Sequence, residues 1–422
     1  MIKQSVKRIL GVILFGAILF VSLSWVSSFL DKTDVDEKYK QFFAEENNID
    51  VIFMGTSHTY NTIMPQEIWN HWGIPSYNFG QSNCTIPITY YVLQMLDEYT
   101  DPSLVVIDLF GVFEYADIGN GKYRTDSRDQ QRVQFDAFPL SSKKIEAVND
   151  VFDDYEDRWD FLFKLAIYHN RWSEIGKANF EPRNIPQKGA AFVLGHHAID
   201  EYLLETDGTA FDIPPIGKDY IERIIGYCSE RGIRLLFTYL PYVFDQAGED
   251  AAASFEKYFA KNPRENVGYL NLLENDIINY HTDIYTDASH LNYIGAAAVT
   301  EWIGGYIAEN YPDTVHRDDP EYASWDEDYD EYVDYKISRF TAGDLYNNLQ
   351  LLYGDDFTAE LIEPCDSQLH ERFISDTTLQ NLTERLGDAI VCRVSDDPSA
   401  PYLTLKVTDR RTGEIVFETV IE

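Results

Sequence analysis

Basic residues are scarce in this sequence. The 422 residues include 34 lysines and arginines against 71 aspartates and glutamates, and the formal net charge is −37. Nucleic-acid binding depends on lysine and arginine neutralising phosphates, and no long basic cluster is present. The charge therefore excludes nucleic acid as the main partner. Anionic lipid headgroups would also repel such a chain unless a hydrophobic element held it at the membrane.

Cysteine is scarce as well. Four cysteines in 422 residues are too few for a disulfide framework, and no Cys-x-x-Cys pair suggests a metal site. Cys84 and Cys228 lie singly beside predicted elements, which is typical of buried thiols. Cys365 and Cys392 both fall in the last segment, and the sequence leaves open whether they pair. We expect neither a metal nor any other cofactor.

One long apolar run, Ile9–Val26, contains no charged residue. About 20 such residues, at about 1.5 Å each, cross the hydrocarbon core of a bilayer. The flanking charges predict a single-pass anchor in the cell membrane, with the amino terminus inside and the bulk of the chain extracytoplasmic. The alternative is a cleavable signal peptide, with Val26 and Ser28 as cleavage positions, although the run is long for one. The charges before the run are Lys3, Lys7 and Arg8, and those after it are Asp31, Asp34, Asp36 and Glu37.

Strand-like and helix-like segments alternate from about residue 48. Leu104–Leu109 is a nearly continuous apolar run, typical of a parallel strand buried on both faces. Strands separated by helices predict an α/β fold whose strands are joined by right-handed crossovers. The other expected strands are 50–54, 77–79 and 234–239, and the expected helices start at Pro65 or span 87–98, 218–231 and 293–311.

Breaks in this alternation define the predicted domains. Residues 313–334 hold ten acids against Arg317 alone, which predicts a solvated linker. A calcium-dependent segment is the alternative, but the glycine and spacing of an EF-hand loop are missing. The last segment predicts a small α+β accessory module with a hairpin across Asp409–Gly413. The full division is an anchor at 1–30, a juxtamembrane linker at 31–47, the α/β domain at 48–312, the acidic linker at 313–334 and the module at 335–422.

The α/β domain contains a less regular stretch at about 114–215. Polar and aromatic residues are mixed there, which favours an insertion that caps the sheet and is helical around Trp159–Glu174.

Two short fragments point to chemistry. Gly55–Thr59 (GlyThrSerHisThr) directly follows the first buried strand, at the edge where parallel sheets face their ligands. Asp287–His290 (AspAlaSerHis) directly precedes the last long helix. Asp287 can orient His290 from one loop, and His290 can take the proton of Ser57, whose neutral hydroxyl is a poor nucleophile. The pattern predicts a catalytic triad; the alternative is that Ser57 and Asp287 merely cap the helices that follow.

On these fragments the sequence resembles the SGNH (GDSL-like) serine hydrolase family over roughly residues 48–312. The family places its nucleophile after the first strand and its Asp-x-x-His near the end of the domain, as Ser57, Asp287 and His290 lie here. For this catalytic domain the resemblance implies a three-layer, SGNH-hydrolase-like (flavodoxin-like) fold, with a parallel sheet and helices on both of its faces. The Gly-x-Ser-x-Gly elbow of α/β-hydrolases is absent, because Thr59 stands where its final glycine belongs.

The family's oxyanion hole is matched only in part. Family members draw donors from the serine N–H, a glycine N–H after the second strand and an asparagine side chain after the third. Asn78–Asn83 matches the second block, with Asn83 where glycine is usual, so the resemblance names Gly80 or Asn83 as a donor. No asparagine follows the third strand. Because a missing donor costs about 10²–10³ in rate, we expect slow hydrolysis, which a transferase tolerates.

Other residues leave alternatives open. His58 either hydrogen-bonds substrate or braces its loop, and Asp108 is either an alternative acid or a strand-end carboxylate bonded to backbone. His196 and His197 have no neighbours at metal-ligand spacing. Trp69, Trp72, Tyr90 and Tyr91 are expected in the core. Carbohydrate stacking is better placed in the insertion, at Tyr155, Trp159, Tyr168 and Trp172.

An anchored, exported chain with this serine turn is similar to acyl-transfer proteins of the cell envelope. These are the serine hydrolase of teichoic-acid D-alanylation and relatives that O-acetylate exported polysaccharides. The resemblance implies a membrane-bound O-acyltransferase partner. We therefore expect a serine O-acyltransferase or esterase that acts on a cell-envelope glycan through an acyl-enzyme on Ser57. The alternatives are a carbohydrate acetylesterase and a non-catalytic scaffold that binds glycan or the membrane partner.

Overall fold

Five parallel strands form the central sheet, in the order β2-β1-β3-β6-β7. Their side chains alternate between two cores, with Ile52 packing into the cluster on one face and Phe53 into the cluster on the other. The predicted α/β fold is thus confirmed, with the strand order 2-1-3-4-5 of a flavodoxin-like sheet. The strands are β1 (Val51–Met54), β2 (Ser76–Asn78), β3 (Leu104–Asp108), β6 (Arg234–Tyr239) and β7 (Val267–Asn271).

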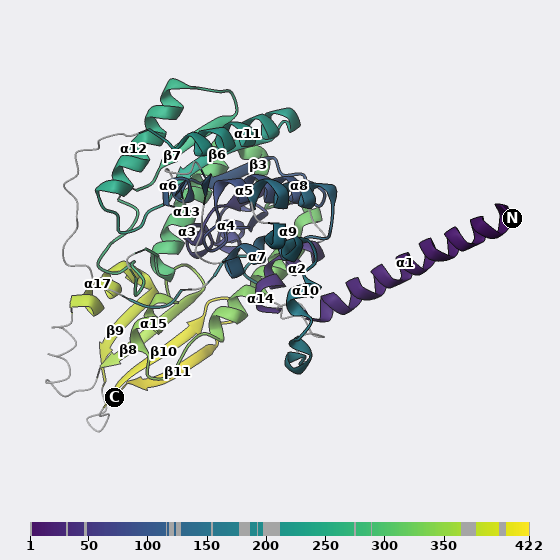
Figure 1. Ribbon diagram of the computed structural model, residues 1–422. Coiled ribbons are helices and arrows are strands. Elements are labelled where there is room, and N and C mark those ends of the chain that lie inside the picture. Colours follow the sequence, from purple (N-terminus) through teal and green to yellow (C-terminus); the bar gives the residue numbers. More distant parts are fainter. Residues whose placement is uncertain are drawn as a thin grey trace.

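The structure is a computed structural model (Figure 1). It describes residues 2–30, 33–45, 49–114, 116–117, 122–123, 128–152, 155–176, 186–191, 193–196, 212–273, 276–287, 289–363, 377–395 and 402–421.

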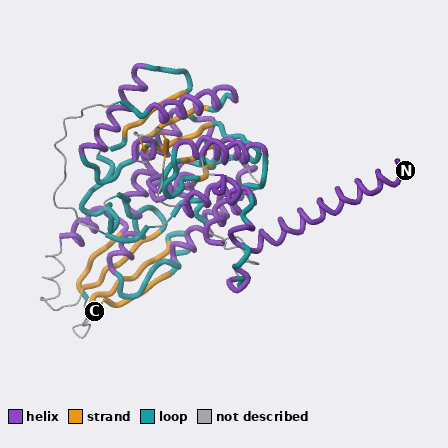
Figure 2. The backbone as a smooth tube through the Cα atoms, in the orientation of Figure 1, coloured by secondary structure: helices purple, strands orange, loops and turns teal. Residues whose placement is uncertain are grey.

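Helices cover both faces of the sheet, as the coloured tube of Figure 2 shows. Tyr91, Ile224 and Phe255 are buried against one face, and Ile68 and Val299 against the other. The first group of helices is α5 (Ile86–Leu96), α11 (Pro215–Arg231) and α12 (Gln246–Lys261), and the second is α3 (Ser57–Thr62), α4 (Pro65–Trp72) and α13 (Tyr293–Asn310).

The N-terminal helix α1 (Ile2–Leu30) projects away from the rest of the chain (Figure 1). Its stretch Gln4–Ser27 has a mean hydropathy of 2.5 and is long and apolar enough to cross a membrane. The next segment differs from the predicted linker, because α2 (Thr33–Ala44) packs Tyr39 and Phe42 into the main core. The two buried aromatic side chains attach this segment to the domain, although acidic residues adjoin them in the sequence.

The insertion is mostly helical and covers part of one face. Phe135 of α7, Phe152 directly after α8 and Phe161 of α9 are buried in the main core. The stretch Trp159–Glu174, predicted to be helical, falls on α9, α10 and η1. Its elements are α6 (Phe110–Glu114), β4 (Ala116–Asp117), β5 (Lys122–Tyr123), α7 (Arg128–Asp136), α8 (Ser142–Val151), α9 (Tyr155–Leu162), α10 (Leu165–Tyr168) and η1 (Arg171–Glu174).

The acidic stretch 313–334 is not simply a solvated linker. It contains η3 (Pro312–Thr314) and η4 (Pro320–Tyr322), and most of α14 (Ser324–Ile337). Trp325, Tyr332 and Val333 of α14 are buried, so this helix turns an apolar stripe inward and its acids outward. The many acids conceal that stripe in the sequence.

The C-terminal module is a four-stranded sheet in the order β11-β10-β8-β9 with its own core. The predicted hairpin is present as β10 (Leu403–Asp409) and β11 (Ile415–Ile421). Its remaining elements are α15 (Leu345–Gln350), β8 (Phe357–Glu363), α17 (Thr377–Leu386), η5 (Gly387–Ala389) and β9 (Ile390–Val394).

The cysteines follow the prediction where the structure describes them. Cys84 and Cys228 are buried thiols, and Cys392 is exposed. Cys365 lies outside the described residues.

Candidate active site

Ser57, His290 and Asp287 converge at the carboxyl end of β1. His290 Nε2 lies 2.8 Å from Ser57 Oγ, and His290 Nδ1 lies 2.9 Å from Asp287 Oδ1. Ser57 and Asp287, which are 230 residues apart in the sequence, therefore meet with His290 in a serine–histidine–aspartate relay. We name this group the relay.

The turn that presents Ser57 depends on Gly55. The φ of Gly55 is +146°, and a Cβ there would lie 2.3 Å from Thr59 Oγ1. Thr56 then caps α3, its Oγ1 accepting from the N–H of His58 at 3.3 Å. Ser57 is the first residue of α3, so its backbone N–H is among the helix-terminal donors that have no acceptor within the helix. Thr56, rather than Ser57, performs the capping role that was the alternative explanation of this serine.

The loop that carries the rest of the relay is closed by backbone pairing. The N–H of Tyr285 donates to His290 O at 3.0 Å, and the N–H of Asn292 donates to Asp283 O at 2.9 Å. Asn292 Oδ1 in turn caps α13 by accepting from the N–H groups of Ile294 and Gly295. Asp287 therefore does not cap this helix. Its Oδ1 accepts from the N–H of Ser289 and contacts the imidazole of His290.

A salt bridge from the C-terminal module supports the same loop. Arg385 Nη2 on α17 lies 3.0 Å from Asp283 Oδ2, and it also donates to Ile277 O at 2.9 Å. Asp283 is fully buried, and burial raises the pKa of its carboxyl although Arg385 acts to lower it. The module thus braces the loop that holds His290 and Asp287, a role that sequence spacing alone did not indicate.

His58 lies buried beside the relay. Its ring stacks on Phe110 with 3.8 Å between centroids, and its centroid is 5.5 Å from that of His290. Burial, with a smaller contribution from His290, lowers the pKa of His58 to about 3, so its imidazole is neutral at neutral pH. Its Nδ1 is buried and has no hydrogen-bond partner among the residues that the structure describes. Substrate binding and bracing of the loop both stay predictions for His58, whose side chain is 3% exposed.

Tyr242 also contacts His58, with 5.0 Å between ring centroids. Phe110 and Tyr242 are site neighbours that the sequence motifs do not indicate. Their position directly after β3 and β6, at the edge where parallel strands end, is the signal that points to them.

Asp108 is not the acid of the relay. Its Oδ1 accepts from the N–H of Leu240 at 3.0 Å, which ties the end of β3 to the end of β6. Burial raises the pKa of this carboxyl to about 7 against the opposing effect of its backbone hydrogen bonds. Of the two predicted roles for Asp108, the backbone-bonded strand-end carboxylate matches the contacts.

Of the two predicted oxyanion donors, Gly80 is engaged elsewhere. The N–H of Gly80 donates to Asn78 Oδ1 at 2.9 Å, so it is not free to receive an oxyanion. A Cβ on Gly80 would lie 2.7 Å from the backbone nitrogen of Tyr60, which explains the glycine by packing. Asn83 has a φ of +53°, and its side-chain amide donates to Gln130.

The described residues contain no group of three histidines, cysteines or acids able to hold an ion. His196 Nε2 lies 3.1 Å from His281 O, and His197 lies outside the described residues.

The aromatic residues weighed as sugar platforms are divided between core and surface. Trp69 and Tyr91 are buried, as expected, and Tyr168 of the insertion is buried too. Trp159 and Trp172 of the insertion are exposed. Nothing is described of the side chain of Tyr155.

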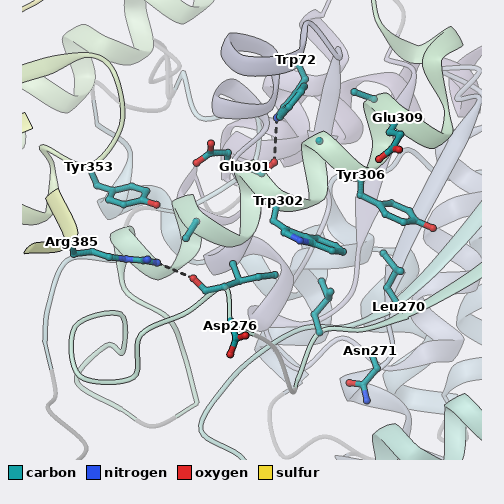
Figure 3. Close-up of a pocket in the computed structure, with 15 residues that line it drawn as sticks. Trp72, Leu270, Asn271, Asp276, Glu301, Trp302, Tyr306, Glu309, Tyr353 and Arg385 are labelled. Atoms are coloured by element: carbon teal, nitrogen blue, oxygen red, sulfur yellow. Dashed lines mark hydrogen bonds between the residues drawn. The ribbon is translucent and has the colours of Figure 1, made fainter. Parts of the chain in front are cut away.

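A cavity of about 1120 Å³ lies apart from the relay, between α13, the end of β7 and the C-terminal module. Figure 3 shows Trp302 and Tyr306 of α13 along it, with Arg385 at one side. Trp72 forms part of its lining and packs on the Gly304–Gly305 pair of α13. No relay residue lines this cavity, so it is not where Ser57 reacts.

Comparison with known proteins gives slight similarities. No protein-family model and no curated protein match the chain. A presumed acylhydrolase from Bacteroides fragilis is similar at 13% identity and a TM-score of 0.31, covering 64% of this chain and 94% of that one. An acetyl xylan esterase from the rumen bacterium Butyrivibrio proteoclasticus is similar at 9% identity and a TM-score of 0.28, covering 62% of this chain and 64% of that one. At these TM-scores neither similarity supports a functional conclusion, which depends on the geometry of the site.

Proposed function

We propose that this chain is a membrane-anchored serine esterase or O-acyltransferase whose nucleophile is Ser57. The supporting observation is the relay, with 2.8 Å between Ser57 Oγ and His290 Nε2 and 2.9 Å between His290 Nδ1 and Asp287 Oδ1. Both distances are those of hydrogen bonds suited to proton transfer and to holding the imidazole in one tautomer. A scaffold that only bound glycan would need no such alignment.

Each half-reaction uses the same three side chains. Ser57 Oγ attacks the carbonyl carbon of an acyl ester while His290 Nε2 takes the serine proton. The proton passes to the leaving alkoxide, and the acyl group stays on Ser57 as an ester. An acceptor hydroxyl or water then attacks this ester, His290 takes its proton, and the proton returns to Ser57 as the product leaves. Asp287 orients His290 and stabilises its imidazolium.

The developing oxyanion is held by fewer donors than the resemblance implies. We propose that the N–H of Ser57, at the start of α3, is one donor. His58, whose Nδ1 has no hydrogen-bond partner among the described residues, stays a predicted substrate contact. Asn83 stays a predicted donor. We propose that this limited set of donors keeps hydrolysis slow and favours transfer to a well-placed hydroxyl.

The substrate and the location that we propose are those expected from the sequence. The apolar helix α1 suits an anchor, and we propose that the remaining chain lies on the extracytoplasmic side. An acyl ester delivered at the membrane is the proposed donor, by way of a membrane-bound O-acyltransferase, and a hydroxyl of a cell-envelope glycan is the proposed acceptor.

The test uses the full-length chain in detergent micelles with 4-nitrophenyl acetate as donor and chitohexaose as acceptor. We expect Ser57-dependent release of nitrophenolate, with acetyl esters on the hexaose detected by mass spectrometry. Free acetate without acetylated sugar would instead favour hydrolysis over transfer, and release of acetate from an O-acetylated glycan would identify the carbohydrate acetylesterase.

The matched control is Ser229→Ala, a serine on α11 outside the site. Equal turnover by wild type and Ser57→Ala would refute the proposal and leave the scaffold. Equal turnover by wild type and the Ser229 variant is expected.

A further inference from the structure

The insertion exposes four large apolar side chains in one short stretch. Trp159, Phe163, Ile167 and Trp172 are 45%, 41%, 36% and 59% exposed, and the rings of Trp159 and Phe163 stack with 4.8 Å between centroids. Exposed apolar side chains of this size that follow one another within one segment mark an interaction surface. We name these four residues the aromatic surface.

The elements beneath the aromatic surface are fixed to the domain. Tyr168 is buried, and its hydroxyl donates to Asp136 Oδ2 at 2.7 Å. Lys164 Nζ donates to Asp136 O at 2.9 Å, and Phe161 stacks on Phe152 at 4.0 Å. The segment that carries the aromatic surface is therefore held in a fixed position on the domain.

The same elements contact the end of α1. Arg171 Nη1 donates to Leu30 O at 2.9 Å, and Leu30 is buried. Figure 1 shows α10 beside the base of α1, and the two helices pack against each other. Arg171 directly precedes Trp172, so the aromatic surface begins where the apolar helix ends.

Helix geometry gives the depth of this contact. The apolar span ends at Ser27, and Leu30 follows three residues later, about 4.5 Å along the helix. The polar headgroup region extends roughly 5–8 Å beyond the hydrocarbon on each side of a bilayer. If α1 spans a membrane, Leu30 and the Arg171 bonded to it lie at headgroup depth.

The connection to α2 leaves the domain little room to move away. Thr33 starts α2 three residues after Leu30, a reach of about 11 Å at most even when fully extended. Tyr39 and Phe42 of α2 are buried in the main core. The domain must therefore rest close to the bilayer whatever the angle of α1.

We propose that Trp159, Phe163, Ile167 and Trp172 insert into the headgroup layer of the membrane that α1 crosses. Tryptophan rings favour this layer, because an apolar body and a polar N–H suit its two sides. The surface would fix the orientation of the relay relative to the bilayer. The inference depends on α1 being retained as an anchor, but not on the esterase activity.

The test places an environment-sensitive thiol-reactive fluorophore on the full-length chain in phosphatidylcholine nanodiscs. The labelled variant is Trp172→Cys, in a background where Cys365 and Cys392 are serine. The matched control is Trp302→Cys, which replaces an exposed tryptophan on α13. A second control, Trp25→Cys, lies within the apolar span of α1.

We expect spin-labelled lipid to quench the fluorophore at 172 at least several-fold more than that at 302, and aqueous iodide to quench it several-fold less. Equal quenching at 172 and 302 by both agents would overturn the proposal. Protection at 172 from iodide without quenching by lipid would also overturn it, since protein would then cover the surface. Failure of lipid to quench the fluorophore at 25 would overturn it by removing the anchor itself, whereas nitrophenolate release reports separately on the esterase.

Discussion

Two groups of charged side chains join distant parts of this chain in opposite surroundings. In the relay, the side chains of His290 and Asp287 are 21% and 50% exposed. In the second group, Lys336 of α14 lies between Glu67 of α4 and Asp356 before β8, and all three side chains are 7% exposed or less. Lys336 Nζ is 2.8 Å from Glu67 Oε1, and the hydroxyls of Tyr293 and Tyr332 donate to the same oxygen at 3.1 Å. We name this second group the buried cluster.

The difference in burial matches a difference in role, which is chemistry for the relay and stability for the buried cluster. Burial acts to lower the pKa of Lys336, but Asp356 and Glu67 outweigh it and hold that pKa well above its usual value. Its charge is therefore permanent, and the buried cluster can only connect the C-terminal module to α4. The relay is partly exposed to solvent, so protons can be exchanged there and a substrate can approach Ser57. Damage to each group should have a different effect.

Ser57→Ala is expected to give the largest change. Removal of the nucleophile should lower ester turnover by about 10⁴–10⁶, because the relay then has nothing to activate. The free energy of unfolding should change by less than about 1 kcal/mol, since no buried contact is lost. Steady-state hydrolysis of 4-nitrophenyl acetate and denaturant unfolding in micelles measure both. A large loss of stability with unchanged turnover would reverse the comparison.

Lys336→Met should have the opposite effect. Glu67 and Asp356 would remain buried without their cation, which is expected to cost about 3–5 kcal/mol of unfolding free energy. Turnover per folded molecule should stay near that of wild type at low temperature. The matched control is Arg393→Ala, which breaks a half-exposed ion pair with Glu360 at 2.7 Å and should cost less than about 1 kcal/mol. Equal effects of the two variants on the unfolding midpoint would contradict the role given to burial.

Asp287→Asn tests how much an exposed carboxylate contributes to the relay. The amide can still hold the ring of His290, but it cannot stabilise the imidazolium, so turnover should fall by about 10–10³. Solvent screens this exposed group, so we expect a smaller loss than for a buried aspartate. The measurement is turnover as a function of pH, and a loss as large as that of Ser57→Ala would show that exposure does not weaken the carboxylate.

Asp108→Asn is expected to change the pH dependence of stability. Burial raises the pKa of Asp108 to about 7, so the folded state favours the protonated carboxyl. This preference is fully present below the usual value of about 4, and it is lost as pH rises through about 7. The asparagine resembles the protonated form. Relative to wild type, the variant should therefore gain roughly 1–3 kcal/mol of unfolding free energy as the pH rises from about 4 to about 8. The same difference in unfolding free energy between variant and wild type at pH 4 and at pH 8 would exclude a raised pKa of Asp108.

Much of the sheet was predictable because its strands are strongly apolar. The prediction of a strand at 234–239 is confirmed by β6, and those at 50–54 and 104–109 agree with β1 and β3 within one residue at each end. The edge strand β7 was not predicted, because Val267–Asn271 is only half-buried and includes a glycine. A short, partly exposed strand has too little apolar pattern to be distinguished from a loop.

The candidate site was predictable for a different reason. Ser57 directly follows a buried strand and His290 directly precedes a long helix, so local patterns placed both at one edge of the sheet. The support from Arg385 and the buried cluster were not predictable, because both depend on contacts between modules far apart in the sequence. Gly80 shows the same limit, since its N–H is already bonded to Asn78, which only the fold reveals.

The most direct measurement is the rate at which a fluorophosphonate modifies the full-length protein, followed by mass spectrometry of the modified peptide. The relay predicts one adduct, on Ser57, that is absent in Ser57→Ala and forms about 10²–10⁴ times more slowly in His290→Ala. No adduct on the wild-type protein, or an adduct that forms equally fast without His290, would contradict the proposal that His290 activates Ser57.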